Sequence, residues 1–205
     1  FSEAPDPMAY SPELIACREH TALAREVAEK SITLLKNDGL LPFTNVHRLA
    51  LIGDLADTAN IGDHSSSMVR PPYVVTLVQA MREDYPEVET VYFPSAEVKE
   101  RLEEIKACDA AVIVCGMRHS DEGEYIWGIG RKTIGGDRTH LGLHAEDIAM
   151  IRQVCPVQRT AVMLMGGNAI TMHDWKDLPD AIFMTYYPGM EGGRFLADIL
   201  FGNVN

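Results

Sequence analysis

The chain has 205 residues, of which 46% are hydrophobic and 23% are charged, and these proportions are typical of a globular unit with one sizeable core. Its formal net charge is −12 and it has no run of lysine or arginine, which argues against binding to nucleic acid because phosphate contacts need clustered basic residues. No apolar stretch approaches the roughly 18 residues of a membrane helix, so no membrane partner is predicted.

The N-terminal segment predicts a linker followed by a long helix. The chain starts at Phe1 with a proline-rich stretch that has the features of neither a native amino terminus nor a signal peptide, so we expect a piece of a larger protein whose compartment is open. Ser-Pro-Glu at 11–13 is a helix-entry sequence. Apolar residues then recur at helical steps up to Leu34, and Asn, Gly and Pro end the pattern. We assign residues 1–42 to this linker and helix.

Beyond residue 42, short apolar runs alternate with helix-like segments. The runs, rich in β-branched residues, are 48–54, 89–94, 110–116, 160–167 and 181–189. The helix-like segments lie near 74–85, 97–107, 144–154 and 191–201. Continuous hydrophobicity indicates strands buried on both faces, and intervening helices indicate parallel crossovers. Residues 43–205 are therefore predicted to form an α/β fold, a three-layer α/β/α sandwich with a mostly parallel sheet of about five or six strands.

Three connections stand out at the carboxyl ends of the predicted strands, where sheets of this kind bind their ligands. They are residues 53–73, the acidic stretch 118–141, and 186–193. The first two are longer than the usual two to six residues of such connections, which favours functional loops over simple links.

The acidic stretch carries Glu122 and Glu124 among several glycines. A string of acids on a loop is often only a solvated surface. At the carboxyl end of a central strand, however, flexible backbone could carry the acids into a neighbouring surface, where carboxylates act in proton transfer. Glycoside hydrolysis is one reaction that uses a pair of carboxyl groups, and a retaining enzyme holds them about 5 to 5.5 Å apart. Nothing in this loop would fix that separation between Glu122 and Glu124. We therefore expect a partner carboxylate elsewhere.

The sequence gives no support for a metal or a cofactor. No second histidine falls at a ligand spacing from His119 and Asp121, and His140 and His144 flank a different element, so we predict no metal site. The phosphate-binding patterns GxGxxG and GxxxxGK[ST] do not follow the first strand, so no nucleotide cofactor is predicted. The cysteines lack metal spacing and are expected to be free thiols: Cys17, Cys108, Cys115 and Cys155.

Polar residues in the first long connection suggest contacts to a hydroxyl-rich ligand. Asp63, His64 and Ser65 lie there, and without a GxSxG sequence a nucleophilic serine is the weaker interpretation. Asp137 and Arg138 could form a local pair that shapes the return of the acidic stretch.

Four segments together resemble the C-terminal α/β domain of glycoside hydrolase family 3, the β-glucosidase type. LAREVAEKSITLLKNDGLLPF resembles the family's linker helix and its ending, RLALIGDLAD its first strand, and HSSSMVRPPYVVT the loop and helix that follow. YYPGMEGGRFLADILFGNVN is similar to its closing segment. In this order the motifs are specific, and they run through nearly the whole chain.

The resemblance implies the role of the acidic stretch. Family members of this type have a loop glutamate that acts as the acid/base, followed by glycine and then by Asp-Arg. Glu122 with its following glycine, and Gly-Asp-Arg at 136–138, match that order, although residues 124–135 are inserted between them. Glu122 is therefore the expected acid/base and Glu124 the runner-up. Trp127 or Tyr125, both in the inserted residues, is a candidate for stacking on a leaving-group sugar.

The family resemblance also implies a partner. Such enzymes carry an aspartate nucleophile on an N-terminal (β/α)8-type barrel, and the active site lies between barrel and α/β domain. We therefore expect a part of a retaining β-glycosidase, β-glucosidase-like, that hydrolyses terminal O-glycosidic bonds of an oligosaccharide or glycoside. Alone, the chain should lack the nucleophile and be inactive. The alternative is a non-catalytic interaction or carbohydrate-binding domain with flavodoxin-like architecture.

Overall fold

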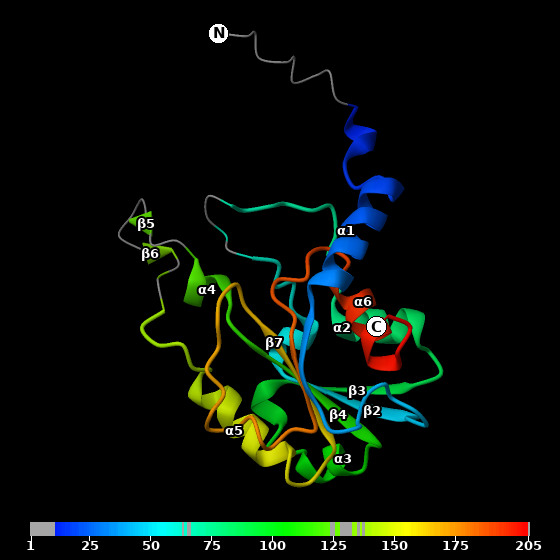
Figure 1. The fold of residues 1–205 in the computed structure, drawn as a ribbon, viewed down its shortest axis with the longest axis vertical. Helices are drawn as coiled ribbons and strands as arrows, with labels where there is room; N and C mark the ends of the chain where they lie inside the picture. The colour runs from blue at the N-terminus through cyan, green and yellow to red at the C-terminus, as the bar shows by residue number, and fades with distance from the viewer. Residues whose placement is uncertain are drawn as a thin grey trace.

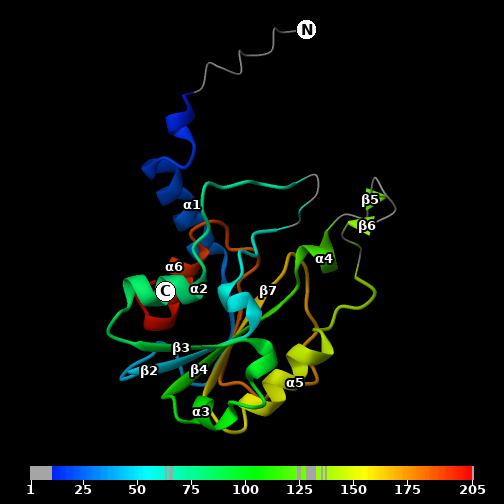
Figure 2. The same cartoon turned by 180° about the vertical axis from the view of Figure 1, so that it is seen from behind.

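A six-stranded sheet covered by helices forms the body of the molecule (Figures 1 and 2). The computed structural model describes residues 11–62, 64, 67–123, 126–127, 133–134, 136 and 138–204, with 126–127 and 133–134 described by their backbone alone.

The sheet has the strand order β1-β8-β7-β4-β2-β3. Its strands are β1 (Thr33–Asn37), β2 (Arg48–Ile52), β3 (Glu89–Phe93), β4 (Ala110–Gly116), β7 (Thr160–Met165) and β8 (Ala181–Met184). All neighbours pair in parallel except β1, which runs antiparallel to β8. The predicted mostly parallel α/β sheet of five or six strands is confirmed.

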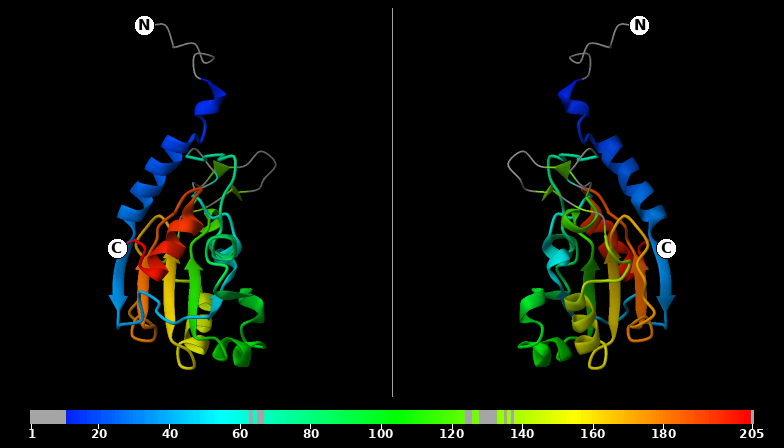
Figure 3. Two further views of the ribbon diagram at one scale, coloured as in Figure 1. Left: turned by 90° about the vertical axis from the view of Figure 1, so that its right-hand side faces the viewer. Right: turned by 90° about the vertical axis from the view of Figure 1, so that its left-hand side faces the viewer.

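Helices cover both faces of the sheet, as the edge-on views in Figure 3 show. Apolar residues of α2 (Leu77–Asp84) and α6 (Gly192–Phe201) pack in one core cluster with side chains from one face of the strands. The opposite face packs against α3 (Leu102–Lys106) and α5 (Ala145–Val154) in a second cluster. Every residue of β4, β7 and β8 is buried, which explains why these strands read as continuous apolar runs.

The N-terminal helix is shorter than predicted. The side chain of Ser11 does cap a helical turn, but that turn is a 3-10 helix, η2 (Pro12–Leu14), and α1 begins later, spanning Arg18–Ser31. The chain then enters edge strand β1, where Leu34 is 52% exposed. The prediction of a helix through Leu34 was wrong because half-exposed apolar residues of an edge strand fit a helical period equally well. The division at residues 42 and 43 stays a prediction.

Shorter elements complete the described chain. They are η3 (Asp54–Asp57), η4 (Ser95–Glu97), α4 (His119–Glu122), and the antiparallel pair β5 (Ile126–Trp127) and β6 (Thr133–Ile134). None of the described helices is long and apolar enough to cross a membrane. The four cysteines are free thiols, as predicted.

The end of β4 requires a glycine. Gly116, opposite Met165 of β7, has a φ of +132°, and a Cβ atom at this position would lie 2.0 Å from the carbonyl oxygen of Met165. Only a residue without a side chain permits this close approach of the two strand ends. The close approach brings the segments that follow β4 and β7 side by side.

Substitution Gly116→Ala is expected to lower the free energy of unfolding by about 2 kcal/mol or more, because alanine is strained at this φ and its Cβ overlaps a backbone oxygen. Gly142→Ala is a matched control, since a Cβ there meets its nearest atoms at 3.5 and 3.6 Å. Its effect should stay within about 0.5 kcal/mol. Urea unfolding measures both, and equal stability of the two variants would contradict the prediction.

Candidate functional site

The candidate site lies at the carboxyl edge of the sheet, where α4 follows β4 after two residues. Figure 1 shows α4 and the segment after β7 at this same end of the strands. The first turn of α4 closes when the backbone N–H of Arg118 donates to Asp121 Oδ2 at 2.8 Å. Glu122 is the last residue of this short helix. The acid that was expected on a flexible loop therefore belongs to a hydrogen-bonded helical turn.

Three distant segments converge on the carboxylate of Glu122. Its Oε2 accepts hydrogen bonds of 2.6 Å from the backbone N–H of Gly167, after β7, and from the hydroxyl of Tyr187, after β8. Its Oε1 lies 3.3 Å from Nε of Arg138. The side chains of Glu122 and Arg138 are only 10% and 9% exposed, so both charges are largely removed from water. Donors from several directions compensate a carboxylate that burial alone would destabilise.

The contact between Glu122 and Arg138 is electrostatic rather than a hydrogen bond. Among the described residues, Glu122 Oε1 and Arg138 Nη1 are buried atoms with no hydrogen-bond partner, since the guanidinium N–H groups are not directed at the carboxylate. Arg138 is instead fixed by donating from Nη2 to the carbonyl of Ala169 at 2.9 Å. Asp137 lies outside the described residues, so its expected local pair with Arg138 stays a prediction.

Glu122 lines a pocket of about 440 Å³, within the range of roughly 300 to 1,000 Å³ typical of small-molecule sites. The other lining residues are Gly62, Ser67, Arg138, Leu141, Gly167, Asn168 and Tyr187. This mixture of hydroxyl, amide and charged groups with one apolar residue suits a polar ligand of modest size.

Burial sets the protonation of two groups near the site. Burial first, and then its hydrogen bond to Glu122, raise the pKa of Tyr187, so this phenol stays neutral and acts as a donor. Burial raises the pKa of Asp147, on α5, to about 6, although its Oδ2 accepts a long 3.4 Å bond from the N–H of Gly116. Beside it, His144 Nε2 lies 3.2 Å from Asp121 Oδ1 and ties α5 to α4.

Several residues predicted for the site are not brought together by the described structure. The ring of His64 stacks on that of His119 with centroids 3.9 Å apart, and the described lining of the pocket includes Ser67 but not His64. Asp63, Ser65 and Glu124 lie outside the described residues, as does the side chain of Trp127. Within the described chain, no cluster of three or more His, Cys, Asp or Glu residues could hold a metal ion.

Sequence reasoning missed Gly167, Tyr187 and the role of Arg138. Gly167 belongs to the pair of glycines that ends the predicted strand 160–167, and a Cβ there would lie 3.2 Å from the Tyr187 ring and 3.4 Å from Glu122 Oε2. Consecutive glycines after a buried strand were the one local signal of this close approach.

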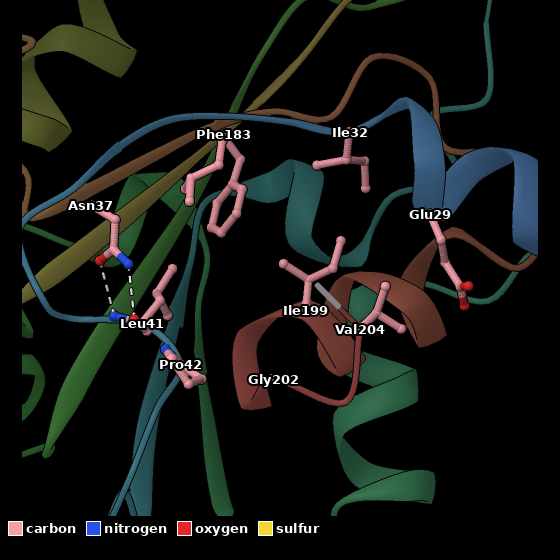
Figure 4. Close-up of a pocket in the computed structure, with 10 residues that line it drawn as sticks. Glu29, Ile32, Asn37, Leu41, Pro42, Phe183, Ile199, Gly202 and Val204 are labelled. Carbon is pink, nitrogen blue, oxygen red and sulfur yellow. Dashed lines mark hydrogen bonds between the residues drawn. The ribbon is translucent and has the colours of Figure 1, made fainter.

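A second pocket, of about 310 Å³, lies away from the site between α1, β1 and the end of α6 (Figure 4). Phe183, Ile32 and Ile199 point into it, and the side chain of Asn37 closes its rim by bonding the backbone of Leu41 in both directions. Its lining is mainly apolar and contains one acid, Glu29, so it offers no group placed for proton transfer. The Glu122 pocket is the better candidate for chemistry.

Comparisons with known proteins show the family of the chain. Residues 32–205 match the glycosyl hydrolase family 3 C-terminal domain. The chain belongs to this family. It is 29% identical to a beta-xylosidase from Formosa agariphila and 29% identical to thermostable beta-glucosidase B from Acetivibrio thermocellus, in each case over 91% of the chain. It also superposes on a β-glucosidase structure from Erythrobacter marinus with a TM-score of 0.83 and 23% identity, over 94% of this chain and 29% of that one.

The chain spans only part of the length of these relatives. It spans 27% of the xylosidase and 25% of the glucosidase, about a quarter of each. One of these relatives is a beta-xylosidase and the other a beta-glucosidase, and what this chain shares with them is the C-terminal domain of family 3 glycoside hydrolases.

Asp147→Asn is expected to stabilise the domain at neutral pH. The folded pKa of about 6 exceeds the ordinary value of 3.8, so the favourable contribution of protonated Asp147 is present below pH 4 and is lost as the pH rises through 6. The variant should gain about 2 kcal/mol at pH 7.5 and almost nothing at pH 4. Urea unfolding at both pH values measures the effect, and Glu146→Gln, at the exposed neighbouring position, is the control. An equal effect of Asp147→Asn at the two pH values would contradict the prediction.

Proposed function

We propose that this domain supplies Glu122 as the acid/base of a retaining, β-glucosidase-like glycosidase. The observation that carries the proposal is a nine-tenths buried carboxylate, held by two hydrogen bonds and lining a pocket at the carboxyl edge of the sheet. Membership of glycosyl hydrolase family 3 and the Glu-Gly order at 122–123 support the same residue. Glu124 is the alternative within the same stretch.

The chemistry needs a second carboxylate. In the first step Glu122 protonates the glycosidic oxygen while a nucleophile attacks the sugar, and in the second it takes a proton from the water that hydrolyses the glycosyl-enzyme. Within the described lining of the pocket, Glu122 is the one carboxylate. We propose that the nucleophile comes from another domain, an N-terminal (β/α)8-type barrel, and the chain alone is expected to be inactive.

The N-terminal segment is suited to connect such a barrel. Figure 3 shows α1 extending past the carboxyl edge of the strands, the same edge that carries Glu122. An ion pair between Arg25 and Asp198 of α6 anchors α1 to the domain. We propose that residues 1–42 lead from the barrel and that 43–205 form the sandwich domain, with β1 reaching from the linker into its sheet. The substrate is a terminal O-glycoside whose glycone is set mainly by the barrel.

Glu122→Ala, in the enzyme that joins this domain to its barrel, should lower turnover by about 10²- to 10⁴-fold, because general acid/base catalysis is removed. Added azide should partly restore turnover of substrates with good leaving groups, since it replaces the water that Glu122 activates. Steady-state kinetics on aryl β-glycosides measure both effects.

Glu124→Ala is the control for this experiment. It should leave activity nearly unchanged, and a crippled Glu124 variant beside an active Glu122 variant would move the assignment by two residues. Full activity of both variants would instead favour the non-catalytic interaction or carbohydrate-binding domain.

A further inference from the structure

We propose that Tyr187 is the positioning residue of the acid/base: its hydroxyl holds the Glu122 carboxyl group at the pocket and stabilises the carboxylate that forms when the proton leaves. This inference rests on the proposed role of Glu122 as the proton donor. It assigns a function to a residue 65 positions away in the sequence.

The hydroxyl of Tyr187 acts as a donor to the carboxylate of Glu122. It lies 2.6 Å from Oε2, and the raised pKa keeps its proton in place. When Glu122 transfers its proton to the glycosidic oxygen, the C–O bond breaks and its electron pair leaves with that oxygen. The new carboxylate then receives charge-assisted hydrogen bonds from Tyr187 and from the N–H of Gly167, which are stronger than those to the neutral acid. The interaction therefore grows along the reaction coordinate, as transition-state stabilisation requires.

The second half of the reaction uses the same contact in reverse. The carboxylate takes a proton from water, the water oxygen bonds to the sugar carbon of the glycosyl-enzyme, and the nucleophile leaves. Tyr187 keeps its own proton throughout, so it positions the acid/base without exchanging a proton itself.

The backbone conformation next to Tyr187 orients its side chain toward Glu122. Tyr186 has a φ of +54°, a left-handed conformation that is uncommon for a residue with a side chain, and proline follows at 188. Thr185 continues the sheet, since its N–H and hydroxyl both bond to the carbonyl of Leu164 at 2.9 Å. The left-handed residue thus redirects the chain immediately after the sheet ends. As a result Tyr186 is 40% exposed, whereas Tyr187 is directed at Glu122.

Gly167 completes the arrangement from the neighbouring strand. Its N–H reaches the same oxygen as Tyr187, and the Tyr187 ring would stand 3.2 Å from a Cβ at position 167. Glycine therefore allows the phenol and the backbone donor to converge on one carboxylate oxygen. This fixes the orientation of the Glu122 side chain from two sides.

The test compares Tyr187→Phe with Tyr186→Phe in the enzyme that joins this domain to its barrel. Each variant lacks one phenolic hydroxyl, and the two substituted positions are adjacent in the chain. Two substrates are used, both with the sugar that the wild-type enzyme hydrolyses fastest: an alkyl β-glycoside, whose leaving oxygen needs protonation, and a 2,4-dinitrophenyl β-glycoside, whose leaving group does not.

Tyr187→Phe should lower kcat/KM by roughly tenfold to a hundredfold for the alkyl glycoside, the effect of losing a hydrogen bond to a charged group. For the dinitrophenyl glycoside the loss should be less than about threefold, because this leaving group departs without a proton. Tyr186→Phe should change neither value by more than about twofold. Both substrates are measured on one preparation, so partial unfolding lowers both rates equally and cannot produce the difference.

Equal losses for the two substrates, or no loss, would overturn the role of Tyr187. Glu122→Gln serves as the reference. If it shows the dependence on the leaving group and Tyr187→Phe does not, only the positioning role fails. If Glu122→Gln itself shows no such dependence, the proposed acid/base assignment fails as well.

Discussion

The parallel pairing of β4 with β7 determines where Glu122 and Gly167 of the candidate site lie. Gly116 and Met165 face each other at the last position of this pairing, and the backbone contact between them tolerates no side chain on the glycine. The chain that leaves β4 enters α4, and the chain that leaves β7 enters the Gly166-Gly167 turn. The strand ends therefore place a carboxylate from one segment against a backbone donor from the other.

In the candidate site, hydrogen bonds and a nearby charge compensate the free energy lost when Glu122 is buried. Burial of Glu122 removes water from its carboxylate, and two donors on Oε2 together with the nearby charge of Arg138 offset that loss. Burial of Tyr187 in turn keeps its hydroxyl protonated and available as a donor. The result is a carboxylate with a defined orientation, the condition that proton transfer to a bound substrate imposes.

In the proposed function, the active site is shared between this domain and a second one. The described pocket provides one carboxylate and several hydrogen-bonding groups. A retaining glycosidase needs two carboxyl groups about 5 to 5.5 Å apart on opposite sides of the sugar. In the proposed function, this domain offers one of them, Glu122, at the carboxyl edge of its sheet, and the second domain carries the other.

The sequence by itself determined the five parallel strands, because residues buried on both faces leave continuous apolar runs that need no knowledge of their neighbours. It also indicated Glu122, through its position after a buried strand and through a family resemblance. It did not reveal β1, whose half-exposed Leu34 carries no strand pattern, nor the contacts of Glu122 with Gly167 and Tyr187, which lie 45 and 65 positions away. Only the tertiary structure decided these, because strand order brings distant segments together and no local periodicity records which side chains then meet.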